Sequence, residues 1–333
     1  MGKELYIFNP QCDMCLAAGR TDINLNSRLR DFVVRNSLLP ALYAPSGSSI
    51  LCLHADPSTL PFYDIAVKRG IGIVREDDIA EDDFVPVPWG WCLQLRHYLA
   101  DKGIGKDVLP ADEELESLRK LSHRRTSIMF YRDAHRFGHF LDIPEPMEFL
   151  SAQDALEFIK ERPNFRFLKF PWSSSGRGVF DLAKVGESKA RQIMESAIRK
   201  QGSLILEKRY DKTLDFATEW HVCGGEVSFI GFSVFGASPD GTYEGNMIAP
   251  QDALQGVILS HCKEPDLLEA LAIQKQVLLK EVAGSYSGPL GIDMLADAEG
   301  RIIPCVEINF RTTMGHVAIW AAEYTRLSHI RIS

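Results

Sequence analysis

The sequence of 333 residues predicts an α/β domain followed by an α+β unit. Over the first 120 or so residues, short apolar runs alternate with stretches of helical periodicity, a pattern that favours a parallel sheet covered by helices. Later in the chain, alternating strands flank short Gly-rich turns, which is typical of antiparallel hairpins. We therefore place the first domain at residues 1–120 and the second at 121–333.

Composition places the chain among ordinary globular proteins, with 45% hydrophobic and 25% charged residues. The formal net charge of -8 argues against nucleic acid as the main partner, because phosphate backbones are gripped by surplus Lys and Arg. Seven scattered cysteines indicate free thiols and a reducing, cytoplasmic setting. No signal peptide or membrane span is expected, since no apolar run approaches about 18 residues.

The first domain is predicted to contain three strands and three helices. The strands are expected at 5–8, 50–54 and 71–74, and the helices at 25–36, 60–68 and 91–102. The segment Pro86–Trp91 is expected to interrupt regular structure, because it holds two prolines and a glycine.

The second unit begins near Leu121 with a basic helical segment at 122–139. The elements expected after it are strands at 147–150, 165–170 and 204–207, helices at 152–161, 189–200 and 267–282, and hairpins spanning 216–234 and 291–308. No internal repeat or long disordered linker interrupts this series.

The most informative segment is the second hairpin. Period-two alternation puts Glu307, Asn309 and Arg311 on one face of its second strand, and Asp293 projects from the partner strand. Carboxylate and carboxamide oxygens are hard ligands that suit Mg²⁺. Arg311 could bind a transferred phosphoryl group. A solvent-facing polar strand, with Arg311 paired to Glu307, explains the pattern equally well when the segment is taken alone.

A second candidate site follows the predicted strand at 165–170. Lys169 lies in an apolar run and is costly to bury unless its ammonium meets an anion. The Ser/Gly loop 173–178 comes directly after it, and small residues let backbone N–H groups close over phosphate oxygens. For a Ser/Gly loop alone, however, a plain surface loop is the more common explanation.

The strand 204–207 becomes abruptly polar at its end, where Glu207, Arg209 and Tyr210 lie close together. Such a strand end can offer backbone groups to an adenine edge. Asp215, eight positions beyond Glu207, could accept from ribose hydroxyls. This signal is weak by itself and gains weight from its position between the other two.

In this order, these segments resemble the ATP-grasp superfamily over roughly residues 121–311. The resemblance implies ATP held between two α+β subdomains, a small one at about 144–210 and a large one at about 211–333, preceded by an α/β domain. Its implied nucleotide contacts are Lys169 on the α- and β-phosphates, a mobile loop containing Ser174, Ser175 and Gly176, the adenine strand Glu207, Arg209 and Tyr210, and the ribose acid Asp215.

The resemblance also implies a metal site and a reaction. Asp293, Glu307 and Asn309 match the residues that hold Mg²⁺, and Arg311 matches the arginine near the γ-phosphate. Arg311 and Lys169 would then be the catalytic residues. Two departures stand out: the family's other phosphate lysine is replaced by arginines such as Arg125 and Arg132, and Asp215 stands where glutamate is usual.

The expected function is therefore an ADP-forming ligase that uses ATP and Mg²⁺ to activate a carboxylate for attack by an amine. Its substrates would be small molecules or a peptide, and a homodimer is compatible with the sequence. A phosphotransferase of the same fold and a non-catalytic nucleotide-binding module are the competing hypotheses. Cys12 and Cys15 have CxxC spacing, and His316 follows Arg311, but packing roles are the more common explanation for both.

Overall fold

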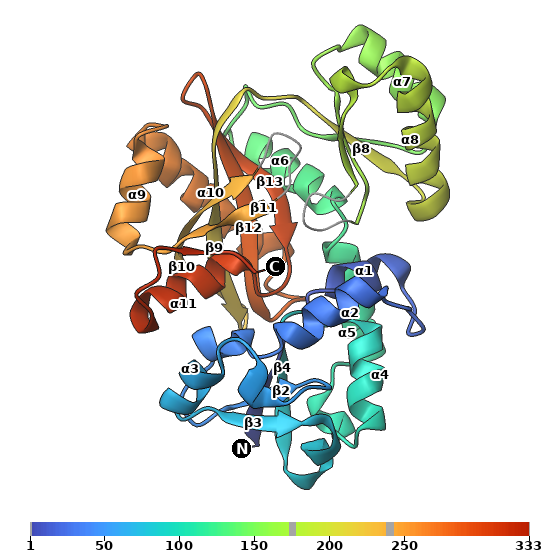
Figure 1. Cartoon of the computed structure of the whole chain (residues 1–333). Coiled ribbons are helices and arrows are strands. Elements are labelled where there is room, and N and C mark those ends of the chain that lie inside the picture. Colours follow the sequence, from blue (N-terminus) through green and yellow to red (C-terminus); the bar gives the residue numbers. More distant parts are fainter. Residues whose placement is uncertain (1, 173–177, 238–242, 333) are drawn as a thin grey trace.

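The computed structural model describes residues 2–172, 178–237 and 243–332. Its strands form three sheets of four, six and four strands. Figure 1 shows the N-terminal sheet with its helices at one end of the molecule, the six-stranded sheet beside α9, α10 and α11, and the small sheet beside α7 and α8. Among the described residues, no helix is long and apolar enough to cross a membrane.

The N-terminal sheet is parallel and has the strand order β3-β2-β1-β4. Its strands are β1 (Lys3–Ile7), β2 (Ser49–Cys52), β3 (Gly72–Arg75) and β4 (Phe84–Pro88). The last of these corrects the sequence prediction, which treated Pro86–Trp91 as a break. β4 is an edge strand, and proline is tolerated at a sheet edge because its missing N–H is not needed on the open side.

The helices around this sheet are α1 (Cys12–Ala18), α2 (Ser27–Arg35), α3 (Tyr63–Lys68), α4 (Leu93–Asp101) and α5 (Asp112–Leu121), with short 3-10 turns at Leu39–Leu42, Pro57–Thr59, Glu76–Glu81 and Lys106–Val108. The three predicted helices correspond to α2, α3 and α4, with shifted ends. The helix α6 (Arg125–Arg136) then leads out of this layer, and the Tyr131 hydroxyl donates to the Cys305 carbonyl oxygen at 2.9 Å.

The small sheet is antiparallel with the order β5-β8-β6-β7. It contains β5 (Met147–Phe149), β6 (Phe167–Lys169), β7 (Val179–Asp181) and β8 (Leu204–Glu207), and it carries α7 (Ala152–Glu161), α8 (Glu187–Gln201) and a 3-10 turn at Leu182–Lys184. Its buried residues form a cluster of their own. Strand β8 and helix α7 have the predicted limits, because caps and apolar runs mark both in the sequence.

The six-stranded sheet has the order β13-β12-β9-β10-β11-β14 and confirms both predicted hairpins. Its strands are β9 (Lys212–Cys223), β10 (Glu226–Ala237), β11 (Tyr243–Met247), β12 (Gly288–Asp297), β13 (Ile302–Asn309) and β14 (His329–Ile330), accompanied by α9 (Gln251–Leu259), α10 (Glu264–Glu281) and α11 (Met314–Tyr324).

The two faces of this sheet differ in chemistry. Ile292 and Thr218 are cross-strand partners on one face, both are fully buried, and Gln274 of α10 accepts from the Thr218 hydroxyl. Asp293 and Glu219 lie on the opposite face, because successive strand residues point to opposite sides. The apolar face thus forms core under α10, and the polar face is left for chemistry.

The N-terminal sheet and the six-stranded sheet share one continuous hydrophobic core. A backbone hydrogen bond from the Thr312 amide to the Trp89 carbonyl oxygen, 2.8 Å long, joins the residues after β13 to those after β4. The carboxyl ends of the parallel strands are therefore fixed against the end of β13.

Two adjacent leucines of α10 test this packing. Leu278 is 1% exposed and Leu279 is 44% exposed. We expect Leu278→Ala to lower the free energy of unfolding by about 2–5 kcal/mol, through lost burial and the cavity left behind. Leu279→Ala should stay within about 0.5 kcal/mol of wild type. Denaturant unfolding of both variants measures the difference, and equal losses would contradict the assigned helix orientation.

Candidate active site

A polar face on β12 and β13 forms the centre of the candidate site. The strand register pairs Asp293 with Glu307 and Gly291 with Asn309, so the three predicted metal ligands lie on one face. Directly paired residues in an antiparallel sheet have Cβ atoms about 4.5–5.5 Å apart. The hairpin thus brings two carboxyl groups and one carboxamide together, as the period-two pattern predicted.

Asp293 sits in strongly unfavourable surroundings for a charge. Burial, followed by repulsion from the Glu307 and Glu219 carboxylates, raises the pKa of Asp293 to about 8. A hydrogen bond from Asn309 and the charge of Arg311 offset only part of this effect. A cation among these oxygens would remove the repulsion.

Glu307 is held by an arginine that the sequence prediction did not select. The Arg124 guanidinium lies 2.9 Å from a Glu307 carboxylate oxygen, and its Nε donates to the Phe170 carbonyl oxygen at 3.1 Å. The Arg124 side chain is buried, at 5% exposed. Arg124, the residue before α6, therefore contacts both the end of β6 and the metal-ligand candidate Glu307.

The two arginines named from the sequence point elsewhere. Arg125 forms a two-bond contact with Glu148, and Arg132 pairs with Glu145; both arginines are more than half exposed. Arg124 and Arg125 are adjacent in the sequence. Which of them points toward Glu307 depends on where α6 begins, and no cap residue marks that start in the sequence.

Lys169 is buried, and its ammonium contacts residues of two sheets. Its ammonium donates to the Val306 carbonyl oxygen of β13 at 3.1 Å and lies 2.6 Å from a Glu207 carboxylate oxygen. Lys169 and Glu207 come from the neighbouring strands β6 and β8. Two predicted nucleotide contacts therefore neutralise each other in this structure.

Arg311 is paired with a residue nearly 300 positions away. Its Nε donates to both Asp13 carboxylate oxygens, at 2.9 and 3.1 Å, and its Nη2 donates to the Asn309 amide oxygen at 3.0 Å. Burial lowers the pKa of Arg311, but the Asp13 carboxylate outweighs it and raises the pKa overall. Burial raises the pKa of Asp13, and Arg311 opposes that shift.

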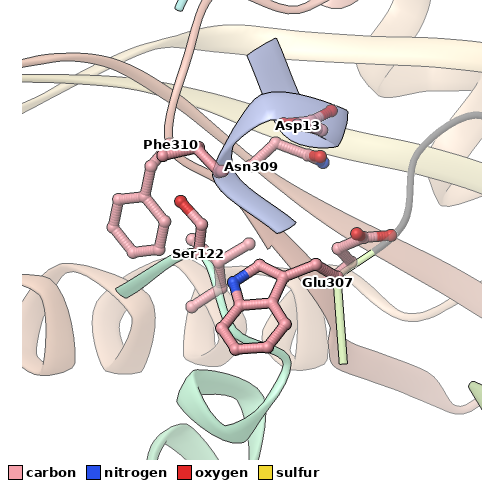
Figure 2. Close-up of a pocket in the computed structure, with 8 residues that line it drawn as sticks. Asp13, Ser122, Glu307, Asn309 and Phe310 are labelled. Atoms are coloured by element: carbon pink, nitrogen blue, oxygen red, sulfur yellow. The ribbon is translucent and has the colours of Figure 1, made fainter. Parts of the chain in front are cut away.

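A small cavity of about 10 Å³ lies at this junction, with room for about one water molecule. Figure 2 shows Asp13 and Asn309 from one side of it, with Ser122 and Glu307 opposite. The remaining lining residues are Leu16, Trp172, Ile308 and Phe310. α1, the end of α5 and β13 therefore meet around one space.

The predicted adenine and ribose residues lie at the end of β8, in the segment after it and on β9. Arg209 is exposed and pairs with Asp181 at 3.2 Å. Tyr210 is half-buried, and burial raises the pKa of its hydroxyl. Asp215, on β9, forms an ion pair with Lys212, and burial raises the pKa of Asp215. Lys212 therefore competes for the carboxylate that the prediction assigned to ribose.

Ser174, Ser175 and Gly176 of the predicted phosphate loop lie outside the described residues. The residue before the loop is held firmly. The Trp172 amide donates to the Gln201 side-chain oxygen at 2.8 Å, and Gln201 donates back to the Trp172 carbonyl oxygen at 3.0 Å. The loop thus starts from a fixed point beside the cavity.

The other motifs have packing roles. Cys12 and Cys15 are buried in α1, and neither thiol forms a disulfide. His316 is fully buried at the start of α11. Within the described ranges, no group of three or more His, Cys, Asp or Glu side chains has an arrangement suited to a metal ion. The Asp293–Glu307–Asn309 set holds two such residues and one amide.

That set nevertheless fits Mg²⁺. It offers hard oxygen donors, and Mg²⁺ commonly keeps water and phosphate oxygens in its remaining positions. Burial, and after it repulsion from Glu307 and Glu219, raises the pKa of Asp293, and a divalent cation would favour its charged form. Donor chemistry and electrostatics therefore agree.

Comparisons with known proteins match this architecture. The fold is similar to that of biotin carboxylase from Campylobacter jejuni, with a TM-score of 0.55 and 15% identity over 98% of this chain and 72% of that chain. It is also similar to D-alanyl-alanine synthetase A from Vibrio cholerae, with a TM-score of 0.51 and 12% identity over 94% of this chain and 90% of that chain. N5-carboxyaminoimidazole synthetase from Staphylococcus aureus, solved with ADP, gives a TM-score of 0.51 and 12% identity over 98% of this chain and 79% of that chain. The chain therefore has the predicted α/β domain and ATP-grasp fold.

Sequence comparison adds one relative. A curated ligase from Niallia circulans, named [butirosin acyl-carrier protein]–L-glutamate ligase, is 28% identical over 148 residues. The match spans 44% of this chain and 32% of that protein, about a third of its length. No protein-family description matches the chain.

The pKa of Asp293 predicts a pH dependence of stability. Between its ordinary value of 3.8 and about 8, the folded protein holds a proton on Asp293 that the unfolded chain releases. The resulting stabilisation is complete below about pH 4 and is lost as the pH rises through about 8. In metal-free buffer, wild type should lose stability across this window relative to Asp293→Asn. Parallel unfolding curves from pH 5 to 9 would contradict this assignment.

Proposed function

We propose that the chain is an ATP- and Mg²⁺-dependent, ADP-forming ligase that activates a carboxylate for attack by an amine or similar nucleophile. The convergence of three buried cations on β13 carries the proposal: Arg124 and Arg311 contact side chains of its polar face, and Lys169 contacts the Val306 carbonyl oxygen at its open edge. Buried cations next to metal-type oxygens suit a polyphosphate with its divalent metal.

The three cations would bind ATP by exchanging partners. Each is now held by a carboxylate: Arg124 by Glu307, Lys169 by Glu207 and Arg311 by Asp13. Phosphate oxygens can replace those carboxylates without leaving a buried cation unpaired. Arg124, rather than Arg125 or Arg132, would then serve in place of the family's other phosphate lysine. Its planar guanidinium can bind two phosphate oxygens.

Asp293, Glu307 and Asn309 would hold Mg²⁺, which, when bound, supplies charge neutralisation at the phosphates. Arg124 would release Glu307 on meeting phosphate. The Asn309 amide oxygen, which now accepts from Arg311, would likewise be released as Arg311 turns to the γ-phosphate. Phosphate and metal sites are thus linked through shared residues.

The acceptor side would be formed by the N-terminal domain. Ligands of open parallel sheets bind outside the carboxyl ends of the strands, where the strand order reverses. In the order β3-β2-β1-β4 that point lies between β1 and β4, and the Asn9 side chain bonds to Gly90 there. Arg311 and its partner Asp13 lie at this end of the sheet, where a Cβ on Gly90 would come within 3.1 Å of the Arg311 Cβ, so a substrate carboxylate there would lie near the phosphate cations.

The reaction would proceed in two steps. A substrate carboxylate oxygen attacks the γ-phosphorus, the bond to the β-phosphate oxygen breaks, and ADP leaves. The nucleophile's nitrogen then attacks the acyl carbon, phosphate leaves with the bonding electron pair, and the nitrogen loses a proton. Lys169 and Arg311 would stabilise charge on the transferred group.

The curated relative supports a choice of substrates to assay first. Its name describes the ligation of L-glutamate to an acyl-carrier protein. We therefore propose an amino acid as one substrate and a carboxylate on a small molecule, peptide or carrier as the other. The short matched region leaves both as proposals for assay.

The first experiment is Mg²⁺-dependent ATP binding by calorimetry, with phosphate release measured against pools of amino acids and carboxylates. We expect micromolar binding by wild type and its loss in Glu307→Gln, because that change removes a metal oxygen and the partner of Arg124. Glu299→Gln, in the turn of the same hairpin and 71% exposed, is the matched control.

The outcomes separate the hypotheses. Release of free phosphate with one pool supports the ligase, whereas phosphate retained on the product identifies a phosphotransferase. ATP binding without turnover on any pool leaves a nucleotide-binding module. Absence of ATP binding by wild type would refute the proposal.

Lys169 has a prediction of its own. Lys169→Met removes a phosphate ligand but leaves Glu207 buried without its partner, so the single variant is expected to be destabilised. Lys169→Met/Glu207→Gln should recover most of the melting temperature and still bind ATP at least about tenfold more weakly than wild type. Thermal melting and calorimetry on both variants check this, and wild-type affinity in the double variant would exclude Lys169 from the nucleotide site.

A further inference from the structure

A buried carboxylate outside the proposed ligand set lies beside the metal-ligand candidates, on the same face of the sheet. Glu219, in the middle of β9, is 1% exposed and pairs in register with Gly291 of β12. Ser233 donates to its Oε1 at 2.9 Å, and the Thr313 hydroxyl donates to its Oε2 at 2.8 Å. His316 Nδ1 lies 3.0 Å from Oε2. Three side chains, one from β10 and two from the start of α11, therefore converge on this group.

Two glycines make room for the carboxylate. A Cβ at Gly315 would lie 1.8 Å from the Glu219 Oε1, and a Cβ at Gly291 would lie 2.6 Å from its Oε2. Contacts this short do not occur between real atoms, so any side chain at Gly315 must displace Glu219. Neither glycine has a positive φ, so space rather than backbone conformation requires them.

Thr313 transmits the contact to a helix. It is the N-cap of α11, and its hydroxyl oxygen accepts from the amides of Gly315 and His316 at 3.1 and 3.2 Å. A carboxylate only accepts, so Glu219 fixes the hydroxyl proton toward itself and leaves the lone pairs for the helix. The negative charge also lies near the positive end of the α11 dipole.

The turn fixed in this way carries Arg311. Thr312, next in sequence, is bound through its amide to the Trp89 carbonyl oxygen, and Thr313 is bound to Glu219. The Arg311 Nη1 also donates to the Thr312 carbonyl oxygen at 3.2 Å. Movement of Thr313 would therefore shift the backbone that sets where the guanidinium lies.

We propose that Glu219 is a positioning residue: through Thr313 and the start of α11 it holds the turn that aims Arg311 at the reacting phosphate. Glu219 touches neither nucleotide nor acceptor. The part of this proposal that concerns turnover rests on the proposed function, whereas the anchoring of the turn does not.

Three variants test it. Glu219→Ala removes the anchor, Glu219→Gln keeps its size but puts a donor where an acceptor is needed, and Gly315→Ala displaces the carboxylate from the other side. Glu226→Gln, on the neighbouring strand and exposed, is the control. Hydrogen exchange of peptides covering 309–318 and calorimetric ATP affinity are measured for each, together with turnover on the responding pool.

We expect faster exchange in 309–318 in Glu219→Ala and Gly315→Ala, near wild-type ATP affinity, and turnover lower by about 100-fold, since a displacement of about 1 Å can cost that much. Glu219→Gln should recover part of the turnover. Lower melting temperature with unchanged turnover of the folded protein would overturn the positioning role, and unchanged exchange in 309–318 would overturn the anchor.

The two levels of failure can be told apart. If wild type forms no ADP with any pool, the proposed function fails, and the exchange comparison still decides whether Glu219 anchors the turn. If Glu219→Ala does not fold, Glu219→Gln and Gly315→Ala supply the same comparison. Wild-type exchange and turnover in both of those variants would refute the proposal.

Discussion

The pairing of buried charges is the constraint on which the arrangement of the three sheets depends. Arg124, Lys169 and Arg311 are each largely withdrawn from water, and each meets a carboxylate from a different part of the chain. An isolated buried charge is strongly destabilising, so the loss of one partner costs more than the pair contributes. The Arg311–Asp13 pair joins the end of β13 to α1, and the Arg124–Glu307 pair joins β13 to the segment before α6. Lys169 and Glu207 pair within the small sheet, and Lys169 reaches the six-stranded sheet through the Val306 carbonyl oxygen. These contacts therefore hold the small sheet, the six-stranded sheet and the N-terminal helices in one relative position, although each ion pair is a weak source of net stability.

The same pairing explains how a rigid fold can accept a highly charged ligand. Glu307 satisfies Arg124 while also facing Asp293, whose pKa is raised by burial and then by repulsion from the Glu307 and Glu219 carboxylates. Under the proposed function, phosphate would replace Glu307 as the partner of Arg124, and a cation would reduce the repulsion between Glu307 and Asp293. Each component would thus improve the site for the other, which is a coupling free energy between two ligands at adjacent positions. Polyphosphate and metal are therefore expected to bind far better together than separately.

The sequence was sufficient for the local part of this design. Period-two alternation placed Asp293, Glu307 and Asn309 on one face, because strand geometry is local and the Asp297–Gly300 turn marks the hairpin. It failed where the partner is distant or the register ambiguous. Nothing local distinguishes Arg124 from Arg125 without a cap to fix the start of α6, and no periodicity connects Arg311 with Asp13. Strand β4 was missed because its prolines are compatible only with an edge position, which a single sequence does not show.

The contact between Arg311 and Asp13 joins the N-terminal domain to the candidate site. Without α1, Arg311 would lose its carboxylate, and without the segment after β4 the end of β13 would lose the backbone bond from Thr312 to Trp89. On the opposite side, Thr313 is tied to Glu219 on the central strand. The residues from Asn309 to Thr313 are thus held from two directions, by the carboxyl end of a parallel sheet and by the middle of an antiparallel one. Arg311 occupies the point where both supports meet, so its position depends on the docking of two domains as well as on the strand that carries it.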